Sequence, residues 1–427
     1  MLLTEMSTIQ LQALKADCER AYEDFKMQNL KLDMSRGKPS PNQLDFSMRI
    51  FDTISTEDLT TTNGFDCRNY GLVDGTPEAK AFFGEMLGTD PDEVIVQGNS
   101  SLSIMFNLIS NSVTHGVLGG LPWHKQESGV KFLCPVPGYD RHFAICEYFG
   151  IDMINIPMDE NGPDMGMVES LVKNDESIKG IWCVPQYSNP SGIVYSNETI
   201  QRLASLKPKA TDFRIYCDNA YCVHHLVENP KTLLNIMEEC KKNQNENILY
   251  VIGSTSKITF AGAGVAALCA SKDNIKSLMK PLSVSTLGYD KISQMRLVKF
   301  IQNAQDLKCH MDKHRKYLAP KFNTVYENLE RDIKPLGIGK WDKPEGGYFI
   351  TFYSINNCAK QIVKLCKGAG VVLTPAGATH PYGNDPNDNT IRIAPSFPTV
   401  DELNAAMELF CISVKLASIE KILDTRT

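Results

Sequence analysis

Seven short apolar segments, separated by loops and helical patterns, constrain the fold of this chain most strongly. Each is three to six residues long and predominantly apolar, which is typical of strands buried on both faces. Helical patterns at Leu102–Ile109 and Asn197–Leu206 separate some of them. This alternation predicts a mainly parallel sheet covered by helices. The predicted strands are Val94–Val96, Lys131–Cys134, Met153–Pro157, Gly180–Val184, Ile215–Asp218, Ile248–Ile252 and Val265–Ala270.

The two ends of the chain have a different pattern. Ile9–Phe25 repeats apolar residues at helical spacing, and after about residue 310 a charged helix is followed by further short strands. A final helix is predicted to begin at Thr399, because Glu402 completes a capping box. We therefore expect an α/β fold, with a mainly parallel seven-stranded sheet in a large domain (residues 55–310) and a smaller α+β domain formed by residues 1–54 and 311–427. The late strands are predicted near Gly347–Tyr353, Gly370–Thr374 and Ile391–Ile393.

Composition and charge exclude several classes of function. The 427-residue chain has a formal net charge of −6 and no block of like charges, so nucleic acid is not an expected partner. The N-terminus lacks the pattern of a signal peptide, and no apolar run is long enough to span a membrane. Thirteen cysteines at irregular spacing, with no CxxC pair, fit a reducing compartment. We expect a cytoplasmic protein with no membrane partner.

The stretch GSTSKITFAGAG, residues 253–264, carries the most specific chemical pattern. It follows a predicted strand, and Lys257 lies in it between hydroxyl residues and a glycine-rich loop. A lysine in such a place can form a Schiff base if its environment favours the neutral amine. A lone lysine is more often a surface residue, so the assignment depends on what the other strand ends supply.

Other predicted strand ends supply the groups that a Schiff-base cofactor such as pyridoxal 5′-phosphate (PLP) requires. Asp218 can keep a pyridine nitrogen protonated, and Tyr139 can stack on the ring. Asn189 and Tyr221 can donate hydrogen bonds to the phenolic oxygen of the cofactor. Asp218 and Asn189 also have ordinary roles in helix caps and turns.

A phosphate site is predicted at Ser100 and Ser101, where the strand Val94–Val96 leads through a short loop into a helix. The backbone N–H groups and hydroxyls of a helix N-terminus suit an anion, although simple helix capping is the alternative. Ligands of open α/β sheets bind at the carboxyl ends of the strands, so these separate sites point to one ligand.

In the order and spacing of these motifs, the sequence resembles the fold-type I PLP-dependent aminotransferases. It is most similar to the bacterial aspartate aminotransferase subgroup Ic, whose domain is called MocR-like. The resemblance implies transfer of an amino group between an amino acid, aspartate or glutamate, and a 2-oxo acid, 2-oxoglutarate or oxaloacetate, by a ping-pong aldimine/ketimine mechanism. The matching motifs, over about residues 33–400, are RNYGLVDGTPEAK, GNSSLS, PVPGYDRHF, QYSNPSG, DNAY, STSKITFAGAG and IRIAPS.

The resemblance also implies catalytic and cofactor-binding roles. Lys257 would hold PLP and shuttle protons, Asp218 would pair with the pyridinium nitrogen, and Tyr221 would complete the catalytic set. Tyr70 would reach the phosphate of the neighbouring subunit, which implies a homodimer with shared active sites. The implied cofactor ligands are Ser100, Ser101, Tyr139, Asn189, Asp218, Tyr221, Ser254, Ser256, Lys257 and Tyr70.

Substrate binding is implied at the other end of the motif set. Arg392, in IRIAPS, would clamp the substrate α-carboxylate, because a planar guanidinium can bind a carboxylate through two hydrogen bonds. Gly37 and Asn189 would lie beside the substrate.

Two arginines of the better-known aspartate aminotransferases have no clear counterpart. Eight residues after the lysine, where a phosphate-binding arginine is usual, this chain has Val265. For the side-chain carboxylate of an acidic substrate, the candidate cation is Arg36, and the second choice is Lys291 from the partner subunit. The alternative is that both are solvent-exposed.

Two further patterns predict other chemistry less well. Gly262–Ala267 matches a dinucleotide fingerprint, but a strand-like run follows it where a helix is required. His310 and His314 have the i, i+4 spacing of a zinc site, but Met311 replaces the glutamate that such a site needs. We therefore predict a solvated helix face there and no metal.

Two alternatives to amino-group transfer stay open. Lys257 and Asp218 serve PLP-dependent lyases and decarboxylases on the same fold equally well. A non-catalytic PLP-binding regulator would carry a separate DNA-binding module, and residues 1–32 hold little more than one helix. The enzyme is therefore favoured.

Overall fold

The largest element of the computed structural model, which describes residues 1–426, is an eight-stranded sheet. Strands β8, β7, β6, β3 and β4 are parallel neighbours. β9 is antiparallel to β2 and β8, and β5 is antiparallel to β4. In sheet order the strands are β2 (Val94–Val96), β9 (Ala266–Ala270), β8 (Leu249–Ser254), β7 (Arg214–Asp218), β6 (Ile178–Cys183), β3 (Lys131–Val136), β4 (Asp152–Asp159) and β5 (Gly162–Pro163).

All seven predicted strands are present, and their ends differ from the prediction by at most two residues. Strands β6 to β9 are buried at every residue, which is why each is a continuous apolar run in the sequence. The eighth strand, β5, is a two-residue pairing with Met158 and Asp159. It has no apolar run of its own, so the sequence pattern did not predict it.

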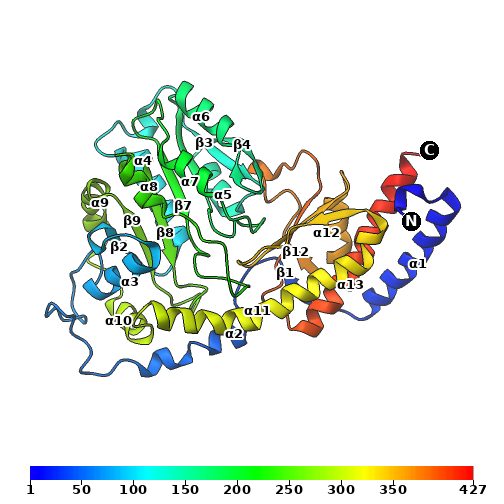
Figure 1. Cartoon of the computed structure of the whole chain (residues 1–427), viewed down its shortest axis with the longest axis horizontal. Helices are drawn as coiled ribbons and strands as arrows, with labels where there is room; N and C mark the ends of the chain where they lie inside the picture. Colours follow the sequence, from blue (N-terminus) through cyan, green and yellow to red (C-terminus); the bar gives the residue numbers. More distant parts are fainter. Residues whose placement is uncertain (427) are drawn as a thin grey trace.

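Helices cover this sheet, as predicted for an α/β fold (Figure 1). In α3, Thr76 caps the first turn by accepting a hydrogen bond from the Ala79 N–H at 3.2 Å, and Gly88 ends the helix at φ 73°. The helices of this part are α3 (Pro77–Leu87), α4 (Ser101–His115), α5 (Asp140–Tyr148), α6 (Met165–Asn174), α7 (Asn197–Ala204), α8 (Ile236–Lys242), α9 (Lys272–Ser285) and α10 (Lys291–Phe300).

Segments from both chain ends pack together beside the large sheet (Figure 1). β1 (Leu32–Met34) pairs in parallel with β12 (Val371–Leu373), and α1 (Thr8–Met27) packs against α13 (Val400–Asp424). Thr399 and Glu402 form the predicted capping box of α13. The remaining elements here are α2 (Pro41–Asp45), α11 (Ala304–Asp332), α12 (Ala359–Gly368) and the antiparallel strands β10 (Gly339–Trp341), β11 (Ile350–Ser354) and β13 (Thr390–Ile393).

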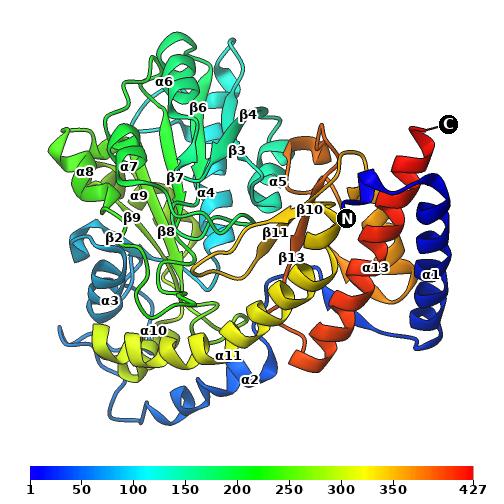
Figure 2. The ribbon, with the colours of Figure 1, turned by 45° about the vertical axis from the view of Figure 1, so that its right-hand side comes forward.

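Helix α11 connects the two parts of the molecule. Figure 2 shows it running from α10, beside the large sheet, to α13, and the two helices α11 and α13 pack against each other. The predicted domain division at residues 54/55 and 310/311 stays a prediction, and α11 is continuous through residue 310. Short 3₁₀ helices link the other elements: η1 (Leu3–Glu5), η2 (Met48–Asp52), η3 (Pro91–Glu93), η4 (Trp123–Lys125), η5 (Glu246–Ile248), η6 (Lys334–Leu336) and η7 (Pro381–Gly383).

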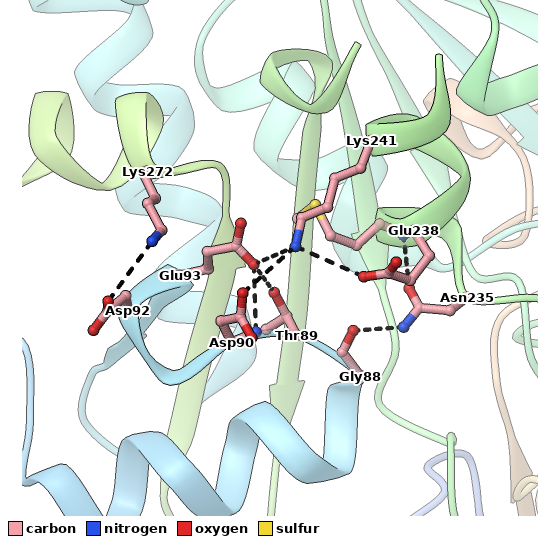
Figure 3. A network of polar contacts seen from close by, with 10 residues as sticks. Gly88, Thr89, Asp90, Asp92, Glu93, Asn235, Glu238, Lys241 and Lys272 are labelled. Carbon is pink, nitrogen blue, oxygen red and sulfur yellow. Dashed lines mark hydrogen bonds and ion pairs between the residues drawn. The ribbon is translucent and has the colours of Figure 1, made fainter. Parts of the chain in front are cut away.

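A buried carboxylate ties the edge of the large sheet to α8 (Figure 3). Glu93 accepts hydrogen bonds from the Thr89 hydroxyl and, at 2.9 Å, from Nζ of Lys241. Burial raises the pKa of Glu93, but the two hydrogen bonds, the charge of Lys241 and the Asp90 N–H together outweigh burial and hold the pKa below its ordinary value. Lys241 also lies 3.7 Å from a Glu238 oxygen and 3.9 Å from an Asp90 oxygen. The start of β2 is thereby fixed relative to α8.

Two further observations concern membrane-spanning helices and the cysteines. Across residues 1–426, none of the helices combines the length and the apolar character that crossing a membrane requires. The thirteen cysteines are all free thiols, and Cys183, Cys217 and Cys269 are buried in the large sheet, where they pack as small apolar side chains.

Candidate active site

A cavity of about 600 Å³ lies where the predicted site residues converge. It opens between the carboxyl ends of β7 and β8 and the segments that carry β1, β12 and β13. A larger cavity of about 860 Å³, beside α3 and the start of α11, is lined by none of them. The predicted residues that line the smaller cavity are Arg36, Gly37, Tyr139, Asn189, Tyr221, Lys257 and Arg392.

Lys257 stands on a tight turn just after β8. The backbone N–H groups of Ile258 and Thr259 both donate to the Thr255 carbonyl, at 2.9 and 2.8 Å. Nζ of Lys257 lies 4.7 Å from the centroid of the Tyr221 ring. The amine therefore reaches into the cavity over an aromatic face.

Asp218, the last residue of β7, is 4% exposed and has one oxygen without a partner. Oδ2 lies 3.2 Å from Nε2 of His142, whereas Oδ1 is buried and has no hydrogen-bond partner among the described residues. Leaving a buried carboxylate oxygen unpaired is costly, so this position calls for a donor such as a protonated ring nitrogen. The His142 ring is held by stacking on Trp182, with centroids 4.4 Å apart.

The sequence did not predict His142. It lies three residues after Tyr139, so α5 places it one turn further along, on the same side of the helix. The motif PVPGYDRHF contains it, and helical spacing from Tyr139 was the pattern that could have indicated its place.

The two cavity tyrosines are hydrogen-bond donors at neutral pH. Burial raises the pKa of Tyr139 to about 12, although the nearby Lys257 ammonium opposes that rise. Burial, and then the charge of Asp218, raises the pKa of Tyr221 as well. Both hydroxyls therefore keep their protons and can donate to an anionic oxygen.

Arg392, on β13, is 5% exposed and held in one orientation. Nε donates to the Thr374 hydroxyl at 3.1 Å, and Nη1 donates to Oδ1 of Asp140 at 2.9 Å. Nη1 also donates to Oδ1 of Asn189 at 3.2 Å, which leaves the Asn189 amide N–H groups free to face a ligand. The guanidinium carbon lies 4.9 Å from the centroid of the Phe349 ring. Asp140 and Thr374 are contacts that the sequence did not predict.

Gly37 allows the backbone at one wall of the cavity to lie close to the Phe349 ring. A Cβ atom at this position would lie 2.5 Å from Cζ of Phe349, so any larger residue would have to displace the Phe349 ring.

The four predicted phosphate-binding serines lie beside the cavity, on segments tied to each other. Ser100 and Ser101 stand at the N-terminus of α4, and Ser254 ends β8. Oγ of Ser256 donates to the Asn99 carbonyl at 3.0 Å, which joins the lysine loop to the start of α4. This arrangement fits an anion. None of the four lines the cavity itself.

Three other predicted positions, Val265, Tyr70 and Lys291, do not line this cavity. Val265 is buried, and its N–H donates to the Thr255 hydroxyl at 2.9 Å, so it offers an anion no charge. Tyr70 is 77% exposed and lies outside the cavity. Lys291 is buried, and its Nζ donates to the Gly71 carbonyl at 3.0 Å.

Arg36 lines the cavity and is exposed. Its carbonyl accepts a hydrogen bond from the Lys38 N–H at 2.9 Å, but within residues 1–426 its guanidinium group makes no hydrogen bond or ion pair. Arg141 also lines the cavity with an exposed side chain, and the sequence did not single it out.

The prediction for His310 and His314 was wrong. They do not form a solvated face: they are 5% and 1% exposed, and their rings contact each other. Helix α11 turns this face inward, against the Lys257 turn and the segment around α2. Among the described residues no cluster of three or more His, Cys, Asp or Glu side chains is placed to hold a metal ion.

Comparison with known proteins identifies the family. A family model described as aspartate amino-transferase matches residues 6–426. An aspartate aminotransferase of Corynebacterium glutamicum is 40% identical over 424 residues, which cover 97% of this chain and 98% of the relative.

Solved structures agree in fold. An aspartate transaminase from Corynebacterium glutamicum has a TM-score of 0.95 and 38% identity, with 99% of each chain covered. An α-aminoadipate aminotransferase from Thermus thermophilus, complexed with N-(5′-phosphopyridoxyl)-L-leucine, has a TM-score of 0.73 and 17% identity, covering 98% of this chain and 96% of that chain. The chain therefore belongs to the aspartate aminotransferase family and has the fold of the fold-type I aminotransferases.

Proposed function

We propose that this protein is a PLP-dependent aminotransferase that moves an amino group between aspartate or glutamate and 2-oxoglutarate or oxaloacetate. The observation that carries the proposal is the unpaired, buried Oδ1 of Asp218 beside a cavity that also contains Lys257. A protonated pyridine nitrogen satisfies that oxygen, and an amine at Lys257 suits an aldehyde.

The donor set fits PLP at each of its functional groups. Asp218 would hold the ring nitrogen, and the Tyr221 hydroxyl and Asn189 amide would donate to the phenolic oxygen. Tyr139 would cover one face of the ring. The phosphate would take the α4 N-terminus together with the four serines, which offer hydroxyl and backbone donors in place of the missing arginine charge at Val265. When bound, PLP supplies a ring that accepts electrons from the substrate Cα.

Side chains of this protein would carry out the proton transfer and bind the substrate. Nζ of Lys257, once it is free of the cofactor, would take the proton from the substrate Cα and return it to the cofactor carbon. Arg392 would bind the substrate α-carboxylate. Amino acids and 2-oxo acids share that carboxylate, so one arginine can serve both halves of a ping-pong cycle.

The acidic side chain of the substrate requires a second cation, because leaving its carboxylate unpaired in a closed site would weaken binding by roughly several kcal/mol. Arg36 is our candidate, since it lines the cavity and its guanidinium is not engaged elsewhere within residues 1–426. The names of the relatives support aspartate as a substrate. They also favour amino-group transfer over the lyase and decarboxylase alternatives.

We further propose a homodimer in which Tyr70 completes the partner's phosphate site. Tyr70, Val284 and Leu287 are 77%, 86% and 62% exposed, so they offer apolar surface that a partner subunit could cover. The Gly71 N–H donates to the Leu287 carbonyl at 2.8 Å, so the two loops form one surface.

Subunit mixing tests the shared site. Tyr70→Phe and Lys257→Ala chains, each inactive alone, should recover activity when heterodimers are re-formed, because one site per heterodimer is intact. No recovery would contradict shared sites.

A cytoplasmic location is also proposed. Thirteen free thiols, eleven of them buried, support a reducing compartment.

The direct test of the function is a half-reaction screen. Single amino acids are added to the PLP-loaded enzyme, and the visible absorbance of the bound cofactor is followed. Aspartate and glutamate should convert the cofactor rapidly, alanine slowly, and Lys257→Ala not at all. Loss of the amino acid as CO₂ or as an elimination product, without a 2-oxo acid, would contradict amino-group transfer.

A further inference from the structure

The buried histidines of α11 reach the turn that carries Lys257. Nε2 of His310 lies 2.7 Å from the carbonyl oxygen of Ile258, the residue after Lys257. The Ser47 hydroxyl donates to the same oxygen at 3.4 Å. Nε2 of His314 lies 3.3 Å from Nε2 of His310. A group of buried donors therefore meets a single backbone carbonyl.

The protonation of this cluster follows from a fixed amide. The Ser40 N–H donates to Oε1 of Gln43 at 3.2 Å, so the other end of that amide is the NH₂ group. Nε2 of Gln43 lies 3.2 Å from Nδ1 of His314, and that ring nitrogen must accept. Neutral His314 then carries its proton on Nε2. His310 also carries its proton on Nε2, because a carbonyl oxygen can only accept. Two N–H groups cannot hydrogen-bond to each other, so His314 does not donate to His310. The Ile258 carbonyl interacts with the His314 N–H as well and opposes the fall in the pKa of His314.

The rings have little freedom to turn away from this arrangement. Phe46 packs edge-on against His314, with centroids 5.3 Å apart, and Phe300 packs edge-on against His310 at 5.2 Å. Gln43 is fully buried and also donates to the Tyr348 hydroxyl at 3.0 Å.

The far end of the cluster reaches the active site as well. The Tyr348 ring lies 6.1 Å from that of Tyr221, the aromatic face under the Lys257 amine. The cluster is therefore connected to the lysine indirectly in two ways: through the Ile258 carbonyl in its turn and through the Tyr348 and Tyr221 rings.

We propose that Gln43 fixes the tautomer of His314, and that the Nε2–H groups of His314 and His310 together hold the Ile258 carbonyl and thereby orient the Lys257 side chain in the cavity. This inference rests on the proposed role of Lys257 as the cofactor-binding lysine. His310 and His314 are then positioning residues: they act through Ile258 and touch no substrate. None of the residues in this cluster needs to change charge during the reaction.

Paired variants of His310 test whether the cluster positions Lys257. His310→Gln keeps a neutral N–H donor at nearly the same reach, whereas His310→Leu keeps the size and removes the donor. Asn328→Leu is the matched control, because Asn328 is also buried on α11 and donates at 2.9 Å to the Thr324 carbonyl, far along the helix from Lys257. If His310→Leu does not fold, Gln43→Leu instead removes the amide that fixes the tautomer of His314.

Three readouts separate orientation from stability: kcat and KM, the thermal midpoint, and the pH midpoint of the visible absorption of bound PLP. His310→Leu should lower kcat about tenfold or more with KM changed by less than about threefold, since misplacing a reacting group mainly slows the chemical step. Its absorption midpoint should shift, by about half a pH unit or more. His310→Gln should restore both, and Asn328→Leu should change only the thermal midpoint.

Each other outcome overturns the proposal. A His310→Leu enzyme with normal kcat and an unshifted absorption midpoint, whatever its thermal midpoint, would show a purely structural role. Equal kcat losses in His310→Leu and His310→Gln would show that the donor is not what matters. A wild-type protein that binds no PLP at Lys257 would instead overturn the proposed function, and the proposed role of the cluster with it.

Discussion

Nη1 of Arg392 donates to Oδ1 of Asp140 at 2.9 Å, so the predicted substrate clamp is bound to a carboxylate of the protein itself. The two side chains are 5% and 30% exposed. An incoming α-carboxylate must share the guanidinium with Asp140 or displace it. Replacing Asp140 with Asn keeps an oxygen acceptor and removes the charge. We expect Asp140→Asn to lower KM by about three- to tenfold, the scale of a partly exposed ion pair.

Steady-state kinetics with aspartate and with alanine measure this effect, which should be equal for both because both carry the α-carboxylate. Glu169→Gln is a suitable control, since it breaks a partly exposed pair with Arg202 away from the cavity. An unchanged or raised KM in Asp140→Asn would mean that Asp140 orients Arg392 and does not compete with the substrate.

Arg36 and Arg141 allow a matched test of acidic side-chain recognition, because both line the cavity with exposed guanidinium groups. Arg36→Ala should raise KM for aspartate on the order of tenfold or more and leave alanine nearly unchanged, since only the dicarboxylate loses a partner. Arg141→Ala should affect the two substrates alike. The reverse pattern would assign the role to Arg141.

Asp218→Asn tests the electronic role of the strand-end carboxylate. The variant should still bind PLP but lose orders of magnitude in kcat, because a neutral amide does not keep the ring nitrogen protonated. Bound PLP is measured by absorbance and kcat by product formation. Asp212→Asn is the control: Asp212 is also buried, near the opposite end of β7, and pairs with Lys179 at 2.8 Å. Near-normal turnover in Asp218→Asn would refute the assignment.

The buried histidines make the folded state sensitive to acid. Burial, and then the neighbouring His310, lowers the pKa of His314 to about 3. In the unfolded chain a histidine has a pKa of about 6.5, so between those values the unfolded state binds the extra proton. The contribution of His314 to stability is therefore complete above about pH 6.5 and is lost as the pH falls toward 3, at no more than about 1.4 kcal/mol per pH unit.

Urea unfolding between pH 7.5 and pH 5 measures this dependence. His314→Gln should lose less stability on acidification than wild type, and His115→Gln, at an exposed position, should follow wild type. Identical slopes in all three proteins would contradict a buried neutral His314.

The sequence pattern was most informative where burial is complete. Strands β6 to β9 are buried on both faces, so continuous apolar runs predicted them, while the short β5 depends on pairing with β4 and leaves no such pattern. Lys257 and Tyr221 were predicted from motifs at strand ends and Arg392 from the family resemblance, and the fold brings all three into one cavity.

The residues that were missed or misjudged depend on contacts between distant segments. His142 and Asp140 have their roles because α5 faces Asp218 and Arg392, which lie 76 and 252 residues away in the sequence. His310 and His314 stand among charged residues, which suggested a solvated face. Only the packing of α11 against the Lys257 turn shows that they are buried.

Borohydride reduction of the PLP-loaded protein tests the central claim most directly. Reduction should fix the cofactor to one lysine, and peptide mass spectrometry should find the pyridoxyl group on Lys257, with no label in Lys257→Ala. The account predicts this because Lys257 alone among the lysines of residues 1–426 lies both in the cavity and over the Tyr221 ring. A label on another lysine, such as Lys38 or Lys367 at the cavity wall, would contradict it.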